Sequence, residues 1–147
     1  ENPHNQNKQK MSSGVAVHED VLQKYQDLKL GHSLRYAIFK LNDSLSEVVV
    51  DTTAAPSANY DEFVKALPAN DCRYAIYDFE YEVDGGKRNK ILFVVWAPDS
   101  AKIKAKMLYA STKDALRKKL VGVGCEVQAT DASEVDYQTV LEKVQRV

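Results

Sequence analysis

The residues of this sequence with the most evident chemistry are cations gathered in one segment, residues 102–120. The segment holds seven Lys or Arg against one Asp, although the whole chain has 20 basic and 21 acidic residues. At about 100° per residue, Lys104 and Lys106 fall on the side of a helix opposite its apolar arc. Ile103 and Met107 lie among them, and an apolar anchor with a charged surround is typical of protein-binding faces, although a single exposed Met or Ile is common. The pattern predicts docking onto an acidic surface, which belongs to a protein, an anionic lipid headgroup or a nucleic acid.

Catalytic patterns are missing from the sequence. Outside the first ten residues the only histidines are His18 and His32, and neither has a Cys or carboxylate at the spacing of a metal site or a Ser-His-Asp site. Cys72 and Cys125 each lie in an apolar run, as small core residues do. We therefore predict a protein that is not an enzyme and that needs no metal and no cofactor.

The composition predicts one globular domain in a reducing compartment. The chain has 147 residues, of which 44% are hydrophobic and 28% charged, which is enough for one well-filled core. It has no apolar run of membrane-spanning length and no disulfide framework, so we expect a cytoplasmic protein. Residues 1–10 contain no aliphatic or aromatic side chain and predict a disordered leader, foreign to the natural chain, before a domain over residues 11–147.

Helical and strand patterns alternate along the domain. A helix is predicted from Val17 to Gly31, and a last helix is predicted to open with a capping box of Asp131 and Glu134. Helices before, between and after the strands indicate an α+β fold, in which a mixed central sheet of five to six strands is sandwiched between helices on both faces. The predicted strands cover residues 35–41, 45–50, 72–83, 91–96 and 122–127, with a short helix near Phe63 and a long helix over residues 102–120.

A set of short stretches adds a family resemblance. The stretches are Ser13-Gly14-Val15, Leu67-Pro68, residues 71–78 (DCRYAIYD), residues 96–99 (WAPD) and residues 106–116 (KMLYASTKDAL). Through them the chain resembles the actin-depolymerising factor/cofilin family across residues 11–146. The resemblance implies one actin-depolymerising-factor homology domain that binds ADP-actin monomers and filament sides, and that severs and depolymerises filaments.

The resemblance also implies two binding surfaces and a regulatory serine. Phosphorylation of Ser13 is implied to switch binding off, although Ser12 lies beside it. A turn at residues 84–87 is predicted to place three cations at the tip of a long hairpin, for which a plain solvated turn is the alternative. The surface for monomers and filaments comprises Ser13, Gly14, Val15, Lys104, Lys106 and Met107, and the filament-only surface comprises Lys87, Arg88, Lys90, Glu142, Lys143 and Arg146.

Two alternatives to a severing protein remain. A coactosin-like module would bind filaments without severing them, and a peripheral module would bind phosphoinositide headgroups through the basic helix, where the family resemblance implies that lipid competes with actin. We do not expect nucleic acid as a partner, because the basic face carries no aromatic side chain that could stack on bases. We expect the chain to be a monomer associated with the actin cytoskeleton of the cytoplasm.

Overall fold

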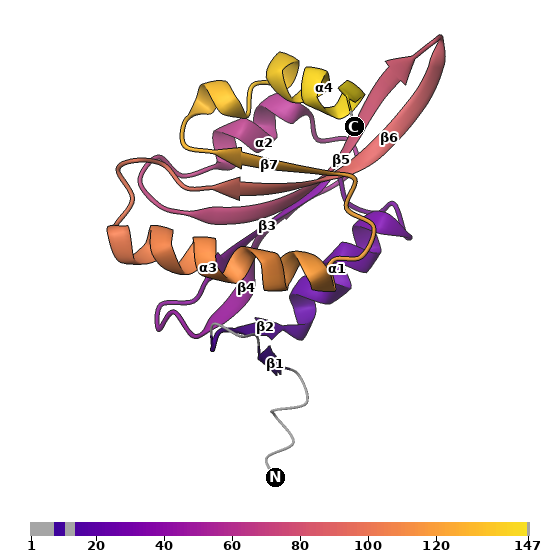
Figure 1. The fold of residues 1–147 in the computed structure, drawn as a ribbon. Coiled ribbons are helices and arrows are strands. Elements are labelled where there is room, and N and C mark those ends of the chain that lie inside the picture. Colours follow the sequence, from indigo (N-terminus) through magenta and orange to yellow (C-terminus); the bar gives the residue numbers. More distant parts are fainter. Residues whose placement is uncertain (1–7, 11–13, 147) are drawn as a thin grey trace.

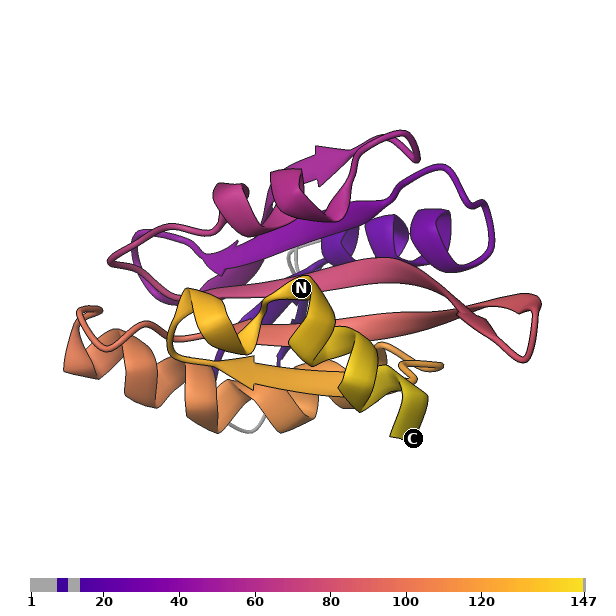
Figure 2. The same cartoon turned by 90° about the horizontal axis from the view of Figure 1, so that it is seen from above.

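The computed structural model describes residues 8–10 and 14–146 of the chain (Figure 1). In this part of the chain, one seven-stranded sheet lies between two layers of α-helices (Figure 2). None of the helices in the described residues has the length and apolar character that a membrane span requires. The strand order is β1 (Lys8–Lys10), β2 (Ala16–His18), β4 (Glu47–Ala54), β3 (Tyr36–Leu41), β5 (Arg73–Val83), β6 (Gly86–Trp96) and β7 (Cys125–Ala129).

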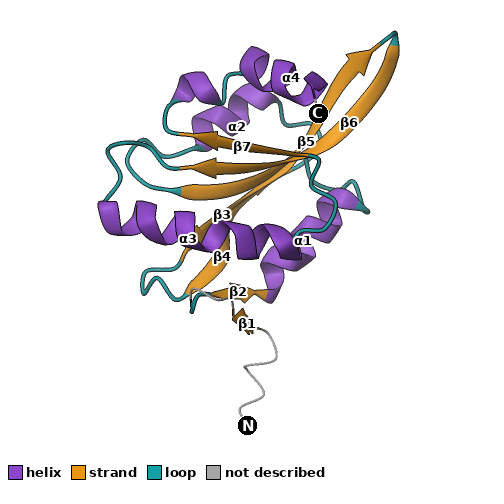
Figure 3. Ribbon diagram, viewed as in Figure 1, coloured by secondary structure: helices purple, strands orange, loops and turns teal. Residues whose placement is uncertain are grey.

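The sheet is mixed and covered on both faces, as the sequence predicts. β2 pairs with β4 and β6 with β7 in parallel, whereas the other neighbours are antiparallel. α1 (Glu19–Lys29) and α3 (Ile103–Lys119) pack over one core cluster, and α2 (Tyr60–Ala66) and α4 (Tyr137–Arg146) pack over the other (Figure 3). Successive residues of β5, such as Ile76 and Tyr77, enter opposite clusters, so this central strand is buried on both faces.

β5 and β6 continue past the rest of the sheet as a projecting hairpin (Figure 1). Val83 pairs with Gly86, so the turn contains only Asp84 and Gly85, with φ of 51° and 78°. Two positive φ values define a type I′ turn, whose twist matches that of the flanking strands. The four-residue turn predicted from the sequence is therefore wrong, and Lys87 already belongs to β6.

The N-terminal part of the domain differs from the sequence prediction. Residues from Val17 onward were predicted to be helical, but Ala16–His18 form β2, and α1 begins only at Glu19. The His18 Nδ1 atom accepts a hydrogen bond from the Asp20 N–H at 3.0 Å and so caps the helix. The predicted disorder of residues 1–10 is wrong for Lys8–Lys10, which form β1. Backbone pairing with the edge of β2 needs no apolar side chain, so composition did not indicate it.

The last helix also begins later than predicted. The Asp131 side chain accepts from the Ser133 N–H at 2.9 Å, and Glu134 Oε1 accepts from the Thr130 N–H at 2.8 Å. These bonds form a capping arrangement, but the element that follows is the 3₁₀ helix η2 (Ala132–Glu134). α4 itself starts at Tyr137.

Candidate functional site

α3 carries the cations and apolar side chains that the sequence places on its outer side. Tyr109, Thr112 and Leu116 are its buried residues. On the opposite side Ile103 is 72% exposed and Met107 67% exposed, and Lys104 is exposed as well. Large apolar side chains this exposed next to cations are the feature that periodicity predicted, and the structure confirms their position.

The rest of the predicted surface, Lys106 and the residues before β2, is less uniformly exposed. Lys106 is half-buried, and its Nζ donates to the Asp99 carbonyl at 3.2 Å. Gly14 is exposed with φ of 84°, a conformation that favours glycine. Val15 is only 2% exposed and belongs to the core under α1 and α3, so its side chain is not on the surface, and its predicted contact with a partner stays a prediction. Ser13 lies outside the described residues. We call Gly14, Lys104, Lys106 and Met107 the helix surface.

The start of α3 is strongly positive for a second reason. Lys102 occupies the N-cap position without a capping side-chain hydrogen bond to any described residue, and the first turn has no acidic residue. The uncapped N–H groups and the helix dipole therefore add to the charge of the lysines. A hollow of about 530 Å³ lies beside this end, between α3, the β3–β4 turn and the segment before β5. Its lining residues include Asn42, Asp43, Asn70, Asp71, Lys102, Lys104 and Tyr109.

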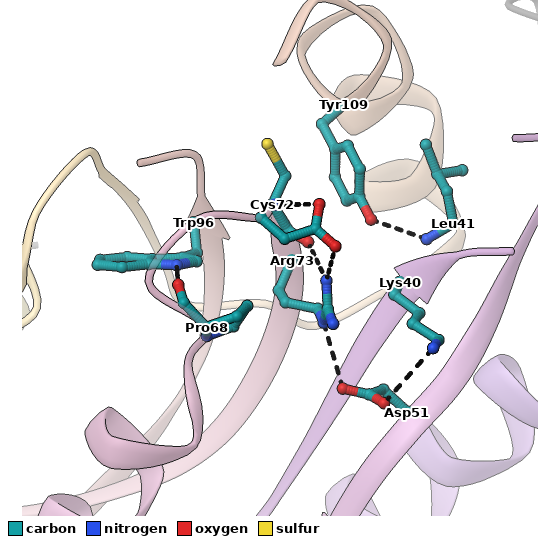
Figure 4. Close-up of polar contacts among 9 residues, drawn as sticks. Lys40, Leu41, Asp51, Pro68, Cys72, Arg73, Trp96 and Tyr109 are labelled. Atoms are coloured by element: carbon teal, nitrogen blue, oxygen red, sulfur yellow. Dashed lines mark hydrogen bonds and ion pairs between the residues drawn. The ribbon is translucent and has the colours of Figure 1, made fainter. Parts of the chain in front are cut away.

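A buried polar contact fixes α3 on the sheet (Figure 4). The Tyr109 hydroxyl accepts a hydrogen bond from the Leu41 N–H at 2.8 Å, and the Tyr74 hydroxyl donates to the Tyr109 carbonyl. The rings of Tyr74 and Tyr109 also pack with centroids 4.9 Å apart. Burial raises the pKa of Tyr109 to about 12, so its hydroxyl remains protonated at neutral pH. The outward direction of Lys104 and Met107 depends on this anchor one turn along the helix.

An ion-pair network lies behind the same end of the helix (Figure 4). The Arg73 guanidinium bridges Asp71, at 2.8 Å, and Asp51, at 3.2 Å, and Lys40 lies 4.0 Å from Asp51. Burial alone would raise the pKa of Asp71, but the hydrogen bond and charge of Arg73 hold it below its usual value. The network ties β3, β4 and β5 together where the chain enters β5.

Two cations in the second half of α3, Lys113 and Arg117, share one carboxylate. Lys113 Nζ lies 3.2 Å from one Glu126 carboxylate oxygen, and Arg117 Nη1 lies 3.3 Å from the other. Burial alone would raise the pKa of Glu126, yet hydrogen bonds from Gln128 and Lys113 and the charges of Lys113 and Arg117 hold it below its usual value. A single strand residue of β7 thus compensates two of the cations of α3. Charge counting along the sequence could not find this, because Glu126 is distant in the chain.

The second predicted surface lies on the other side of the sheet. Lys87 and Arg88 are exposed on the hairpin, and Glu142, Lys143 and Arg146 are exposed on α4. Lys90 differs from these residues. Its Nζ donates to the Val144 carbonyl at 3.2 Å, and its side-chain stem packs against Gly124. Lys90 therefore connects β6 to the last turn of α4. We call Lys87, Arg88, Glu142, Lys143 and Arg146 the hairpin surface.

Within residues 8–10 and 14–146, no three His, Cys, Asp or Glu side chains are grouped as metal ligands. Both cysteines are buried and unpaired, and burial raises the pKa of each thiol.

Comparisons with known proteins agree with this arrangement. The family model described as "Cofilin/tropomyosin-type actin-binding protein" matches residues 14–145. Cofilin of Mycosarcoma maydis is 59% identical over 137 residues, which are 92% of this chain and 98% of that protein. Actophorin of Acanthamoeba castellanii is 56% identical over 134 residues, which are 91% of this chain and 97% of that protein. The crystal structure of Streptomyces griseoflavus cofilin superposes with a TM-score of 0.85 at 50% identity, covering 90% of this chain and 98% of that one. The chain belongs to the cofilin/tropomyosin-type family of actin-binding proteins.

Proposed function

We propose that this protein binds ADP-actin monomers and filament sides through the helix surface, and severs and depolymerises filaments with the help of the hairpin surface. The observation that carries the proposal is the exposed Met107 beside Lys104 at an uncapped, positively charged helix start. Such a face suits an acidic protein surface with an apolar recess. The identity to cofilins over nine-tenths of the chain supports actin as the protein that offers it.

The separation of the two surfaces supports contact with two subunits. α3 packs over the core cluster that contains Tyr109 and Leu116, whereas α4 packs over the cluster that contains Val140 and Val144. The sheet lies between them, so the helix surface and the hairpin surface face different directions (Figure 2). A protein that contacts one actin subunit with each surface binds filaments more strongly than monomers and strains the contact between the two actin subunits.

Two further elements of the proposal concern regulation and place. Phosphorylation of Ser13, next to Gly14 of the helix surface, adds about 1.5 to 2 negative charges and repels an acidic actin surface. The protein acts in the cytoplasm on the actin cytoskeleton, as a monomer.

Phosphoinositide headgroups are a second candidate ligand. The hollow of about 530 Å³ beside Lys102 and Lys104, together with the uncapped start of α3, favours phosphate groups at this end. A lipid bound there covers part of the helix surface, so it competes with actin.

The testing experiment is co-sedimentation with actin filaments, scoring both the bound protein and the actin released into the supernatant. Lys104→Ala with Lys106→Ala should lose monomer and filament binding together, because central interface charges contribute on the order of 2 kcal/mol or more. Folding stability should change by no more than about 0.5 kcal/mol, because both ammonium groups lie off the core. The matched control, Lys24→Ala with Lys65→Ala, removes equal charge from α1 and α2, outside both surfaces, and should bind normally.

The same assay separates the alternatives. Filament pelleting without released actin, and without severing of single filaments under the microscope, would favour a coactosin-like module. Unchanged monomer affinity of the double variant at Lys104 and Lys106 would remove the helix surface from the proposal.

A further inference from the structure

β5 has a stretch of backbone edge that no strand covers. β3 pairs with β5 only up to Tyr77, and the next backbone bond runs from the Asp78 N–H to the Arg35 carbonyl at 2.9 Å. β5 continues to Val83, and over this last part its only partner strand in the described residues is β6. A strand placed beside this last part of β5 would continue the line of β3 along the same edge; we call this position the lane.

The free backbone groups on this edge belong to Glu80 and Glu82. Val83 and Gly86 flank the two-residue turn, so the N–H groups of alternate residues back from Val83 point towards β6. Those of Glu80 and Glu82 point the other way, as the Asp78 N–H does. In the part of the chain that the structure describes, the backbone N–H and C=O groups of these two residues have no partner. An unpaired edge of this kind is a template for another extended chain.

One side of the edge opens onto a hollow beside α4. The hollow has a volume of about 430 Å³, and its lining combines Tyr81, Tyr137 and Leu141 with the polar residues Glu80, Glu82, Lys87 and Gln145. Tyr137 is 45% exposed although its ring stacks on Phe79 with centroids 5.3 Å apart. An aromatic side chain held rigidly by one face and open on the other offers contact area at low entropic cost.

The other side of the edge carries the carboxylates of Glu80 and Glu82, and Lys87 on β6 lies across from Glu82. The Glu80 and Glu82 side chains alternate with the buried Phe79 and Tyr81, so they lie on the opposite face of the strand. Glu80 forms an ion pair with Arg35 at 3.2 Å but is still 62% exposed at its side chain, and Glu82 is exposed. A second copy of this chain paired along the same edge would set Glu against Glu. The charge therefore excludes self-pairing and selects a cationic partner.

We propose that an extended peptide segment with alternating cationic and apolar side chains binds to β5 as an added strand, in the lane where β3 stops. Its backbone pairs with Glu80 and Glu82, its apolar side chains enter the hollow at Tyr137 and Leu141, and its cations face the two glutamates. Main-chain bonds give affinity and the alternating pockets give specificity, as in other cases of strand addition. The site adjoins the hairpin surface, because Lys87 lines the hollow, but binding there does not require actin.

The test uses the full chain and a fluorescein-labelled acetyl-Lys-Val-Lys-Val-Lys-Val-Lys-amide probe, followed by fluorescence anisotropy and amide hydrogen exchange. We expect saturable binding and slower exchange at the Glu80 and Glu82 amides. A peptide of the same composition with its lysines and valines in separate blocks should bind about tenfold more weakly, because it cannot place its side chains on alternate faces. Equal binding of the two peptides would leave only charge attraction and overturn the proposal.

Two variants at one position isolate the backbone contribution. Glu82→Thr removes the charge and keeps the N–H, whereas Glu82→Pro removes the N–H as well, and that N–H takes no part in the pairing with β6. Glu82→Pro should bind the probe about tenfold more weakly than Glu82→Thr. A probe with N-methylated valines should lose the same factor against the wild-type chain, which covers the case of a misfolded proline variant. If neither change lowers affinity, or if protection falls on other strands, strand addition at β5 is refuted.

Discussion

Removal of the Tyr109 hydroxyl tests how α3 is held on the sheet. In Tyr109→Phe the ring still fills its place in the core, but the Leu41 N–H loses its acceptor. That N–H lies at the end of β3, where β5 has already diverged, so no neighbouring strand can replace the bond. The variant therefore removes one buried hydrogen bond and leaves one buried donor unpaired.

The expected cost follows from burial. Tyr109 is 2% exposed and Leu41 6% exposed, so water does not reach the donor freely. An unsatisfied buried donor costs about 1–3 kcal/mol, and we expect about 2 kcal/mol for this one. With an unfolding entropy of about 2.1 cal/mol/K per residue, that loss lowers the Tm by roughly 7 °C for a domain of this size.

The measurement is chemical denaturation and calorimetry of Tyr109→Phe beside Tyr81→Phe. Tyr81 is also buried, but its hydroxyl has no hydrogen-bond partner among the described residues, so that control should lose less than about 0.5 kcal/mol. Amide exchange at Leu41 should accelerate in Tyr109→Phe alone. Equal stability loss in both variants, with unchanged exchange at Leu41, would show that the Tyr109 hydroxyl does not anchor the helix.

Four further variants test the two surfaces, the bond of Lys90 to α4 and the ion pairs of Glu126. Met107→Ala should weaken monomer binding about tenfold without changing its salt dependence, since the lost term is apolar burial; a flattened salt response in a binding titration would contradict this. Lys87→Ala with Arg88→Ala should weaken filament binding, increasingly so as salt is added, and should leave monomer affinity unchanged; parallel losses in the monomer and filament assays would mean that the two surfaces are one. Lys90→Ala should instead lower the Tm, because it loses its hydrogen bond to α4. The lowered pKa of Glu126 means that its ion pairs stabilise the fold fully above the ordinary value of 4.5 and less as pH falls below it. Glu126→Gln should therefore cost stability at pH 7 and progressively less as the pH is lowered below 4.5; a cost independent of pH in urea titrations would refute this.

Periodicity predicted the parts of the fold that are long and locally determined. α3 has enough turns for its buried and exposed sides to separate, and β5 and β6 are long enough to show where burial on both faces ends. β2 has only three residues and pairs in parallel with Glu47 and Val48, some thirty positions away. No local pattern marks a strand that short, so its residues were assigned to the neighbouring helix.

The candidate site likewise contains some residues whose positions the sequence predicts and others whose positions it does not. The exposure of Met107 and Lys104 follows from their helical positions, and the structure confirms it. The burial of Val15 could not be predicted, because it depends on β2 joining the edge of the sheet. The bond from Lys90 to the Val144 carbonyl joins residues more than fifty positions apart, and only the packing of α4 on β6 creates it.

The distribution of free charge on α3 is the step at which structure changes the functional interpretation most. Counted from the sequence, α3 carries Lys and Arg residues near both of its ends. Such a helix would attract anions along its whole length. Glu126 on β7 compensates Lys113 and Arg117, while the start of the helix keeps its lysines, its uncapped N–H groups and its dipole without an opposing acid in the first turn. This end also carries Met107, so charge orients the partner and apolar burial holds it at one place. The Glu126→Gln variant would release two cations at the far end, and broader, less specific binding to anionic vesicles should accompany its loss of stability.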